Sequence, residues 1–373
     1  MKSKIVHFST GHVRNELRVH LKQCHSLAEA GFDVTFVTCD GMGDDDSGEI
    51  QVIDIGKPKG RLHRFFWLPM LMLSTLKKMK ADLYHFHDPE LIFLGLLLQV
   101  SGHIVIYDVH EDVPRSILSR DWIPSSLRSL ISKVFEYFEN SCSARFSGIV
   151  GATSEITTRF SHLNSMVVLV RNYALNSEVK REIKPDYYSA TVGYFGALSR
   201  VRGIYELVEA VKLSKAKKLI LAGPVENEQL SNWLLKESQR EQKIEYLGVI
   251  TREEVLMKIS ECSVGAALYH HEPNHINAEP NKIFEYMSYS LPILGSNFPL
   301  WKDLITTGDC GVVVDPLNPS EIADQIDFLV SDPVKCSKIG HNGRSKLEKL
   351  YLWSSEFKKL ETLYSRLLDH ADR

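Results

Sequence analysis

The sequence predicts an α/β protein built from two doubly wound, Rossmann-like domains, and three observations lead to this fold class. Short apolar segments that suit strands alternate with amphipathic segments that suit helices, the order expected of parallel strands joined by crossover helices. This series occurs twice, on either side of a polar segment. With 373 residues, the chain is also too long for one ordinary hydrophobic core.

The expected strands recur along both halves of the chain. Because parallel sheets of this kind bind ligands at the carboxyl ends of their strands, the loops that follow these strands should hold functional residues. In the first half the strands are expected near residues 4–8, 33–38, 82–87, 103–109, 148–153 and 166–170. In the second half they are expected near residues 190–195, 217–222, 243–247, 263–268, 292–295 and 311–314.

The polar segment in the middle of the chain, residues 171–185, is expected to be a hinge. The predicted organisation is an N-terminal domain over residues 1–171, a linker over 172–188 and a C-terminal domain over 189–350. The last segment, residues 351–373, is expected to form an amphipathic helix.

Net charge, cysteine spacing and the length of the apolar runs exclude several classes of protein. The formal net charge is −3, without the basic excess typical of nucleic-acid-binding proteins, so no nucleic-acid partner is expected. The six cysteines are scattered without a disulfide framework, and the chain enters its first strand directly rather than through a signal peptide. No apolar run is long enough to span a bilayer. These features predict a cytoplasmic protein.

Residues 277–296 combine a helix start, a lysine, a glutamate and a short apolar strand. Pro280 suits the first turn of a helix, where free amide groups bind anions such as phosphate. Glu285, one turn further on, can accept hydrogen bonds from two sugar hydroxyls. Together these features suit a nucleotide sugar. The alternative is an amphipathic helix that packs on a core, with Lys282 and Glu285 in solvent.

The run Pro280-Asn-Lys-Ile-Phe-Glu-Tyr-Met287 and the strand after it resemble the donor-site signature of retaining glycosyltransferases with the GT-B fold. That family includes sucrose synthases and bacterial mannosyltransferases. The resemblance implies two Rossmann-like domains facing a cleft and a last helix that crosses back to the first domain. It also implies that Glu285 binds the donor ribose and that Asn281 and Lys282 lie at the donor. The family's other glutamate, which touches the donor sugar, is replaced here by Asn277.

A glycine-containing turn, residues 193–203, follows the first expected strand of the second domain. Gly196 lets a ligand approach the backbone, and Arg200 and Arg202 can neutralise a diphosphate. The alternative is an ordinary turn with two solvated arginines. In the family, an arginine and a lysine of this turn hold the leaving diphosphate. The resemblance places Arg202 at the lysine position and Ala197 at the arginine position, with Arg200 as the candidate replacement.

Polar residues also follow the strand expected at residues 103–109. His110 can bind a sugar hydroxyl, transfer a proton near neutral pH or cap a buried turn. By resemblance, a histidine here lies against the donor sugar, and Glu111 and Asp112 become candidate acceptor contacts. The run His85-Phe-His-Asp88 is similar to a subgroup of the family. Its spacing alone supports only a weak metal-site hypothesis, because no further ligand is evident at a strand end.

Two other loops complete the candidate set. The loop after the first strand lacks the glycine pattern of dinucleotide-binding proteins, and the chain has no Walker motif. By resemblance this loop brings donor phosphate and acceptor together, with Gly11 at the donor and His12 and Arg18 at the acceptor; a solvated helix start is the alternative. Backbone groups of Val249 and Ile250 are expected, by resemblance, to read the nucleobase.

The sequence is therefore interpreted as a retaining GT-B glycosyltransferase that moves a sugar from a nucleoside diphosphate to a lipid-linked polysaccharide acceptor. No cofactor or metal ion is expected, since basic side chains and helix-start amides can stabilise the diphosphate. An inactive donor-binding partner subunit and a GT-B sugar-nucleotide 2-epimerase remain as alternatives. The expected catalytic residues are His110, Arg202 and Glu285. The expected donor-binding residues are Gly11, Gly196, Arg200, Arg202, Val249, Ile250, Asn277, Asn281, Lys282 and Glu285, and the expected acceptor residues are His12, Arg18, Glu111 and Asp112.

Residues 61–80 place aromatic and apolar side chains between two basic ends. The segment is too short to span a bilayer, but it suits peripheral binding to an anionic membrane surface, where a lipid-linked acceptor resides. The equally weighted alternative is a helix packed against the sheet, with its basic ends in solvent.

Overall fold

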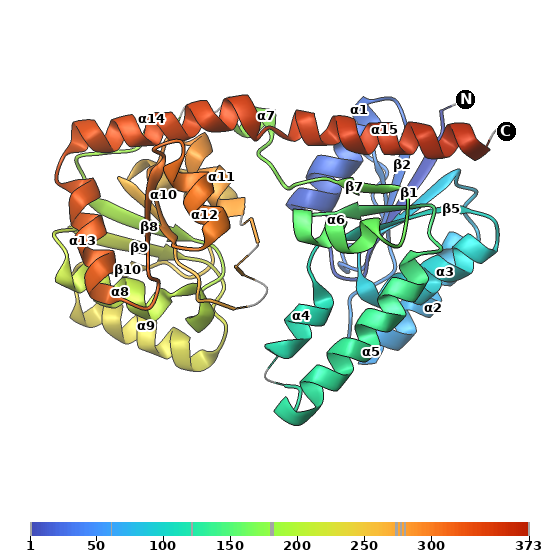
Figure 1. Cartoon of the computed structure of the whole chain (residues 1–373), viewed down its shortest axis with the longest axis horizontal. Coiled ribbons are helices and arrows are strands. Elements are labelled where there is room, and N and C mark those ends of the chain that lie inside the picture. Colours follow the sequence, from blue (N-terminus) through green and yellow to red (C-terminus); the bar gives the residue numbers. More distant parts are fainter. Residues whose placement is uncertain are drawn as a thin grey trace. The chain divides into compact units, whose positions relative to one another are not determined.

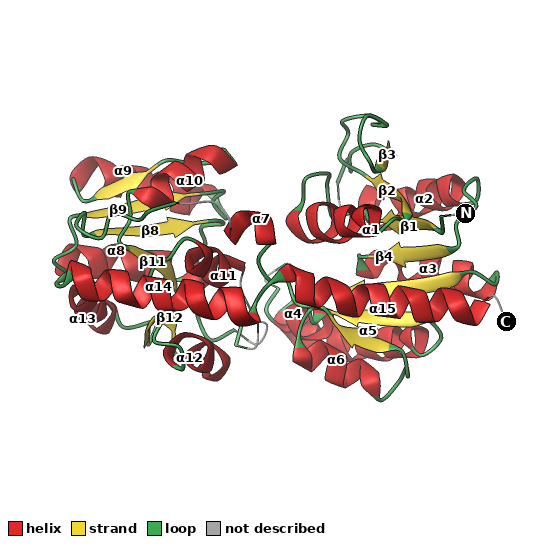
Figure 2. Cartoon of the chain, turned by 90° about the horizontal axis from the view of Figure 1, so that it is seen from above, coloured by secondary structure: helices red, strands yellow, loops and turns green. Residues whose placement is uncertain are grey.

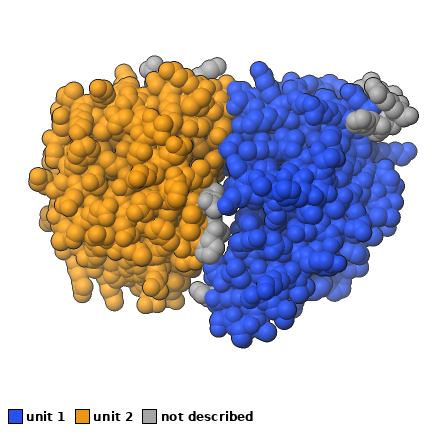
Figure 3. All heavy atoms as spheres, in the orientation of Figure 1, with its two compact units in different colours: residues 1–172, 353–373 blue, residues 173–352 orange. Residues whose placement is uncertain are grey.

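The computed structural model describes residues 2–60, 62–120, 122–179, 183–272, 275–276, 278–279 and 281–371. The chain forms two compact units (Figure 3). Unit 1 consists of Met1–Asn172 and Trp353–Arg373, and unit 2 consists of Tyr173–Leu352. The segment expected to be a linker contains the short helix α7 (Asn176–Val179), which is part of unit 2.

Unit 1 is built on a seven-stranded, parallel sheet with the order β3-β2-β1-β4-β5-β6-β7 (Figure 1). The chain moves outward from β1 in one direction and then in the other, which makes the sheet doubly wound, as the sequence predicts. The strands are β1 (Lys4–Phe8), β2 (Asp33–Thr38), β3 (Gln51–Asp54), β4 (Leu83–Phe86), β5 (Ile104–Val109), β6 (Gly148–Gly151) and β7 (Val167–Leu169).

Helices cover both faces of this sheet. The π-type helix η1, α1 and α15 lie on one face, and α2, α3 and α5 lie on the other (Figure 1). The helical elements are η1 (Leu17–Cys24), α1 (His25–Glu29), η2 (His63–Trp67), α2 (Leu68–Leu76), η3 (Pro89–Leu91), α3 (Ile92–Val100), α4 (Val113–Leu118), α5 (Ser125–Ser143), α6 (Ser154–Ser161) and α15 (Trp353–Ala371).

Unit 2 repeats the architecture with a six-stranded parallel sheet in the order β10-β9-β8-β11-β12-β13 (Figure 2). Its strands are β8 (Thr191–Phe195), β9 (Lys218–Ala222), β10 (Ile244–Tyr246), β11 (Val264–Ala267), β12 (Ile293–Ser296) and β13 (Gly311–Val314). Its other helices are η4 (Arg200–Arg202), α8 (Ile204–Leu213), α9 (Glu228–Arg240), α10 (Arg252–Ser260), α11 (Asn281–Ser288), α12 (Pro299–Thr306), α13 (Pro319–Val330) and α14 (Pro333–Leu350).

All strands expected from the sequence are present, and one strand was missed. This is β3, at the edge of the unit 1 sheet, where Val52 is the buried residue and Gln51 is exposed. Its short, half-polar sequence carries little of the apolar signal that marks the central strands.

The last helix returns to unit 1, as expected. The indole Nε1 of Trp353 donates a hydrogen bond to Ser26 Oγ at 2.8 Å, and Glu356 accepts the backbone N–H of Arg171. Tyr364, further along α15, is fully buried in unit 1. Within the described part of the chain, every helix is too short or too polar to cross a bilayer.

Candidate functional site

In unit 2, three loops at the carboxyl ends of neighbouring strands are tied together through their backbones. The N–H of Gly196 donates to the carbonyl of Ala222 at 2.8 Å, and the N–H of Gly223 donates to the carbonyl of Gly248 at 2.7 Å. Gly196 and Gly223 have φ angles of +128° and +143°. A Cβ at Gly223 would lie 2.1 Å from the carbonyl oxygen of Gly196, so the close approach of these loops requires glycine.

The side chain of Lys282 points into this cluster of loops. Lys282 is only 7% exposed, and its Nζ has no hydrogen-bond partner among the described residues. The ammonium lies 3.4 Å from the centre of the Tyr194 ring and beside Gly196. Burial, together with the nearby Arg202, lowers the pKa of Lys282 well below its usual value. A buried, unpartnered cation of this kind is costly unless an anion joins it.

The two arginines of the turn after β8 differ in their exposure to solvent. Arg202 Nη1 donates to the carbonyl of Ala197 at 3.3 Å, and its guanidinium lies 5.2 Å from the Tyr269 ring centre. Arg202 is half-buried and close enough to Lys282 to affect its pKa. Arg200, by contrast, is exposed. Of the two expected arginines, the structure therefore brings Arg202 to the buried lysine.

Glu285 lies one turn after Lys282 on α11. Its side chain is 19% exposed and forms an ion pair with Arg252 at the start of α10. Asn281 is exposed at the first position of α11. Ile250 is half-buried and Val249 is exposed in the loop after β10. Two of the expected residues, Asn277 and Pro280, lie outside the described residues.

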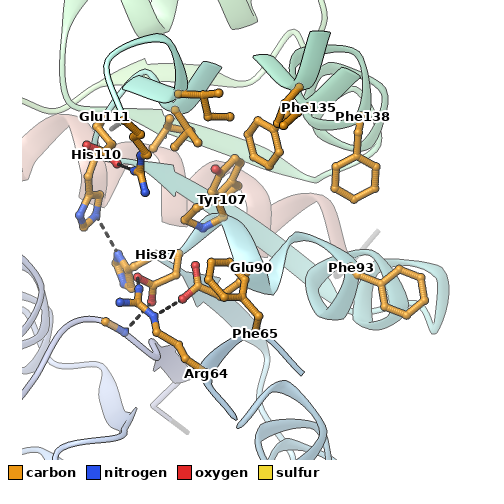
Figure 4. A pocket seen from close by; sticks show the side chains of 18 of the residues that line it. Arg64, Phe65, His87, Glu90, Phe93, Tyr107, His110, Glu111, Phe135 and Phe138 are labelled. Carbon is orange, nitrogen blue, oxygen red and sulfur yellow. Dashed lines mark hydrogen bonds and ion pairs between the residues drawn. The ribbon is translucent and has the colours of Figure 1, made fainter. Parts of the chain in front are cut away.

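In unit 1, a cavity of about 960 Å³ opens at the carboxyl ends of β4 and β5 (Figure 4). One end is polar and contains His87, His110 and Arg64, whereas aromatic and aliphatic side chains form the rest of the wall. The apolar wall consists of Phe65, Phe93, Val113, Ile117, Trp122, Ile123, Ile131, Phe135 and Phe138.

The structure brings some of the expected unit 1 residues to this cavity and excludes others. Gly11, His12, His110 and Glu111 line it, but Arg18 and Asp112 are not among its lining residues. Arg18 is 4% exposed. Arg18 therefore lies in the core rather than at the cavity, and its guanidinium contacts other groups of unit 1.

Arg18 and Asp112, which do not line the cavity, form ion pairs and hydrogen bonds with other residues of unit 1. Arg18 Nη2 forms an ion pair with Asp108 Oδ1 at 2.8 Å, and its Nη1 donates to the Val170 carbonyl at 2.9 Å. Asp112 caps α4 by accepting the Arg115 N–H, and it forms an ion pair with Arg159 at 3.3 Å. Asp112 thus holds helices together instead of facing the cavity.

Asp108 and two histidines form a compact polar group at the inner end of the cavity. Asp108 Oδ2 lies 3.2 Å from His110 Nε2 and 3.4 Å from His87 Nδ1, and these two nitrogens are 3.2 Å apart. Burial opposes ionisation of Asp108, but Arg18 and His110 lower its pKa well below its usual value. Burial likewise lowers the pKa of His87 well below its usual value, so its ring is neutral.

These three atoms could hold a metal ion by their spacing, and so could the side chains of His7, His85 and His87. Sequence reasoning found no further ligand for the His-x-His-Asp run because the missing groups come from other strands. His7 on β1 pairs in register with His85 on β4, and Asp108 is on β5. Histidine and aspartate inside otherwise apolar strands were the signal that could have found them.

Arg64, which the sequence assigned only to a basic end of the segment 61–80, also lines the cavity. It forms ion pairs with Asp88 and Glu90, which follow β4. Asp88 Oδ2 also accepts hydrogen bonds from Ser9 Oγ at 2.5 Å and from the N–H of Thr10 at 2.8 Å. These contacts join the loop after β1, the loop after β4 and the helix η2 around the polar end of the cavity.

Family models match both units. The model for glycosyl transferases group 1 matches residues 177–346, and the model for glycosyltransferase family 4 matches residues 18–164. Capsular polysaccharide biosynthesis glycosyltransferase CapM of Staphylococcus aureus is 25% identical over 190 residues, which are 48% of this chain and 47% of that protein. The match thus spans about half the length of this curated relative.

Solved structures share the fold over nearly the whole chain. Sucrose-phosphate synthase of Thermosynechococcus elongatus has a TM-score of 0.78 and 15% identity, covering 99% of this chain and 100% of that chain. HepE of Anabaena, solved in complex with UDP, has a TM-score of 0.72 and 17% identity, covering 98% of this chain and 100% of that chain. HepE has also been solved with UDP-glucose. At these identities the likeness establishes the architecture of both units.

Proposed function

Because the chain belongs to the glycosyltransferases with the GT-B fold, we propose that it transfers a sugar from a nucleoside diphosphate donor to a saccharide acceptor. The observation that carries the proposal is the buried Lys282 in unit 2, whose ammonium has no hydrogen-bond partner within the described part of the chain. A diphosphate is an anion of the right charge to partner it. The UDP and UDP-glucose complexes of HepE support a nucleotide sugar as the class of donor.

The diphosphate occupies the space between Lys282 and the turn after β8. Gly196 leaves room for phosphate oxygens beside the Lys282 ammonium, and Arg202 supplies a second positive charge. Cations preorganised at the leaving diphosphate stabilise the charge that builds as the glycosidic bond breaks. These side chains provide that stabilisation without a resident metal ion.

The nucleoside extends along α11 toward Glu285. The Glu285 carboxylate accepts hydrogen bonds from the two ribose hydroxyls, and Arg252 holds that carboxylate in place. Asn281 lies at the helix start beside the diphosphate, and backbone groups of Val249 and Ile250 read the base.

We further propose that transfer retains the anomeric configuration. The buried carboxylates near His110 are already committed to other side chains, and the exposed Glu111 pairs with Arg120 at 3.2 Å, which makes a covalent carboxylate intermediate unfavourable. Asp108 is buried against Arg18, Asp88 accepts from Ser9 and Thr10, and Glu90 pairs with Arg64. A same-face mechanism then remains, in which the departing phosphate receives the proton of the acceptor hydroxyl.

The acceptor occupies the cavity of unit 1. Its polar end, with His110, His12 and Glu111, suits a saccharide, and its aromatic wall suits the apolar part of a lipid-linked acceptor (Figure 4). The S. aureus relative is a capsular polysaccharide glycosyltransferase, which supports a saccharide acceptor of this kind.

The helix beside the cavity supports peripheral binding to an anionic membrane. One face of α2 packs in the core through Leu68, Met72 and Leu76. The preceding residues Phe66 and Trp67 are 66% and 63% exposed. One face of this segment thus packs against the sheet, and the other face is free to contact a membrane surface. Three lysines at its end, Lys77, Lys78 and Lys80, are exposed.

Vesicle co-sedimentation tests the membrane proposal. Each basic residue near an anionic surface contributes about 1 kcal/mol, so neutralising Lys77, Lys78 and Lys80 should release the protein from anionic vesicles at low salt. Neutralising three exposed lysines of α14 (Lys335, Lys338 and Lys349) is the matched control and should change little. Equal effects of the two triple variants would contradict the proposal.

Turnover of a panel of nucleotide sugars tests the transferase proposal. The wild-type chain should release nucleoside diphosphate from one donor class, and Arg202→Ala should reduce this release strongly. Arg200→Ala is the matched control in the same turn and should reduce it little, because Arg200 is exposed. Donor binding without any release would instead indicate an inactive partner subunit.

A further inference from the structure

Hydrogen bonds connect a series of side chains in the interior of unit 1, and this series leads to His110. His85 Nδ1 lies 2.5 Å from the Tyr364 hydroxyl, which lies 3.0 Å from His7 Nε2. His7 Nδ1 then lies 2.9 Å from His87 Nε2, and His87 Nδ1 meets Asp108 and His110. We call this group the histidine chain; its members are His85, Tyr364, His7, His87, Asp108 and His110.

The histidine chain is anchored at Asp108. This carboxylate is fully buried, and its Oδ1 is held by Arg18 at 2.8 Å while its Oδ2 accepts from Gln23 Nε2 at 2.6 Å. The adjacent Arg18 guanidinium favours its ionised form. The two histidine nitrogens lie 3.2 Å from each other as well as 3.2 and 3.4 Å from Asp108 Oδ2. An ionised carboxylate only accepts hydrogen bonds, and a bare ring nitrogen at these distances would face its negative charge, so we assign both nitrogens as donors to Asp108.

The donor direction at Asp108 fixes the other contacts in turn. If His87 donates from Nδ1, its neutral ring must accept at Nε2 from the Nδ1–H of His7. His7 then accepts at Nε2 from the Tyr364 hydroxyl, whose oxygen accepts from the Nδ1–H of His85.

The surroundings of His85, at the end of the histidine chain furthest from His110, agree with this order of donors and acceptors. His85 Nε2 is buried and has no hydrogen-bond partner among the described residues. In the deduced direction this nitrogen carries no proton and is an unpaired acceptor. The reverse direction would leave a buried N–H unpaired, which is rarer in folded proteins.

We propose that Asp108 and the rings behind it are positioning residues that hold His110 as the Nε2–H tautomer and present its unprotonated Nδ1 to the cavity. His110 is 16% exposed and lines the cavity (Figure 4). Its Nδ1 then accepts a hydrogen bond from a hydroxyl of the bound saccharide. The identity of that hydroxyl rests on the proposed function, whereas the tautomer does not.

The same atoms have the spacing of metal ligands, but two observations disfavour a metal site. The ligand atoms of His87, Asp108 and His110 form a triangle with edges of 3.2–3.4 Å, as ligands on one face of a tetrahedral ion would. However, the Arg18 guanidinium already neutralises Asp108 and would repel a second cation. A metal ligand at His87 Nδ1 would also reverse the hydrogen-bond direction and leave the His85 N–H unpaired.

Nuclear magnetic resonance of the ¹⁵N-histidine-labelled chain tests the tautomer directly. Ring nitrogens with and without a proton differ in ¹⁵N chemical shift, and His110→Gln assigns the His110 signals. The expected result is a protonated Nε2 and a bare Nδ1 on His110. A proton on Nδ1 in the wild-type chain would overturn the proposal, and this measurement needs no destabilised variant.

Asp108→Asn tests the causal link. If the oxygen of the introduced amide keeps facing Arg18, the NH₂ group of that amide donates toward His110 and should move the ring proton to Nδ1. The expected result is the other tautomer, with a kcat at least roughly tenfold lower and the donor KM within about twofold, as wrong tautomers act in catalytic triads. His103→Gln, outside the histidine chain, is the matched control and should leave both the tautomer and kcat unchanged.

The remaining outcomes distinguish failure of the positioning role from failure of the proposed function. An unchanged His110 tautomer in folded Asp108→Asn would overturn the positioning role. Signals of His87 and His110 that shift with one equivalent of Zn²⁺ would identify a metal site and also overturn it. If the wild-type tautomer is as expected and no donor is turned over, the proposed function fails while the positioning of His110 stands.

Discussion

The candidate sites of the two units differ in whether their buried charged side chain has hydrogen-bond partners. In unit 1, the buried Asp108 is surrounded by Arg18, Gln23 and two histidines. In unit 2, the buried Lys282 has no hydrogen-bond partner among the described residues. A buried carboxylate that is already partnered without ligand fixes the geometry of its neighbours, whereas a buried cation without a hydrogen-bond partner costs stability until an anion binds. This difference agrees with the positioning role proposed for unit 1 and the anion-binding role proposed for unit 2.

Breaking the buried ion pair of unit 1 should have the largest effect. Arg18→Met leaves Asp108 charged and short of its main partner, which typically costs about 3–5 kcal/mol in the free energy of unfolding. Urea denaturation measures this cost. Lys215→Ala removes a solvent-exposed ion pair with Asp327 and should cost less than about 1 kcal/mol. Similar costs for both variants would show that the unit 1 network is not tightly coupled.

Removing the lone cation of unit 2 should change stability and affinity in opposite directions. Lys282→Met keeps an apolar stem at a site that is 7% exposed, so the free energy of unfolding should rise. Calorimetry should show nucleoside diphosphate binding weakened by about 1.5–3 kcal/mol, the range for hydrogen bonds to charged groups. Lys236→Met, an exposed lysine on α9, is the control. A variant that binds as tightly as wild type would remove Lys282 from the site.

Glu285→Gln should weaken nucleoside diphosphate binding by about 1.5 kcal/mol, because a neutral acceptor replaces the carboxylate assigned to the ribose. Stability should change little, since the partner Arg252 is 44% exposed and can turn to solvent. Arg252→Ala keeps the carboxylate and should cost less affinity. If the arginine variant loses more affinity than the glutamine variant, Arg252 rather than Glu285 contacts the ligand.

The pH dependence of stability should report the depressed pKa of Lys282. The unfolded chain binds this proton up to its ordinary pKa of about 10.4, whereas the folded chain releases it at lower pH. Between these pKa values, wild-type stability should rise with pH relative to Lys282→Met, by at most about 1.4 kcal/mol per pH unit. Below the folded pKa the difference should be constant. Parallel stability curves across this window would contradict a depressed pKa for Lys282.

The same comparison explains how much of each site was predictable. Lys282 and Glu285 are on one helix and Arg202 is in one turn, so contiguous motifs revealed them. In unit 1, His7, Asp108 and Tyr364 meet only through strand register and the docking of the last helix. A single sequence gives no measure of those long-range contacts. The expected strands were found because their apolar runs are local signals.

Two of the expected acceptor residues lie away from the cavity for the same reason. Arg18 follows the first strand like a loop residue, but it lies on η1 and is drawn into the core by Asp108. Asp112 similarly became a helix cap. Their burial and partners depend on residues distant in sequence, which local patterns do not reveal.

The most direct test of the account is a crystal structure of the chain with the nucleoside diphosphate that raises its melting temperature most. The predicted result is a diphosphate within hydrogen-bond distance of Lys282 Nζ, with ribose hydroxyls at Glu285. A diphosphate bound elsewhere, with Lys282 still unpartnered, would contradict the assignment of the donor to unit 2.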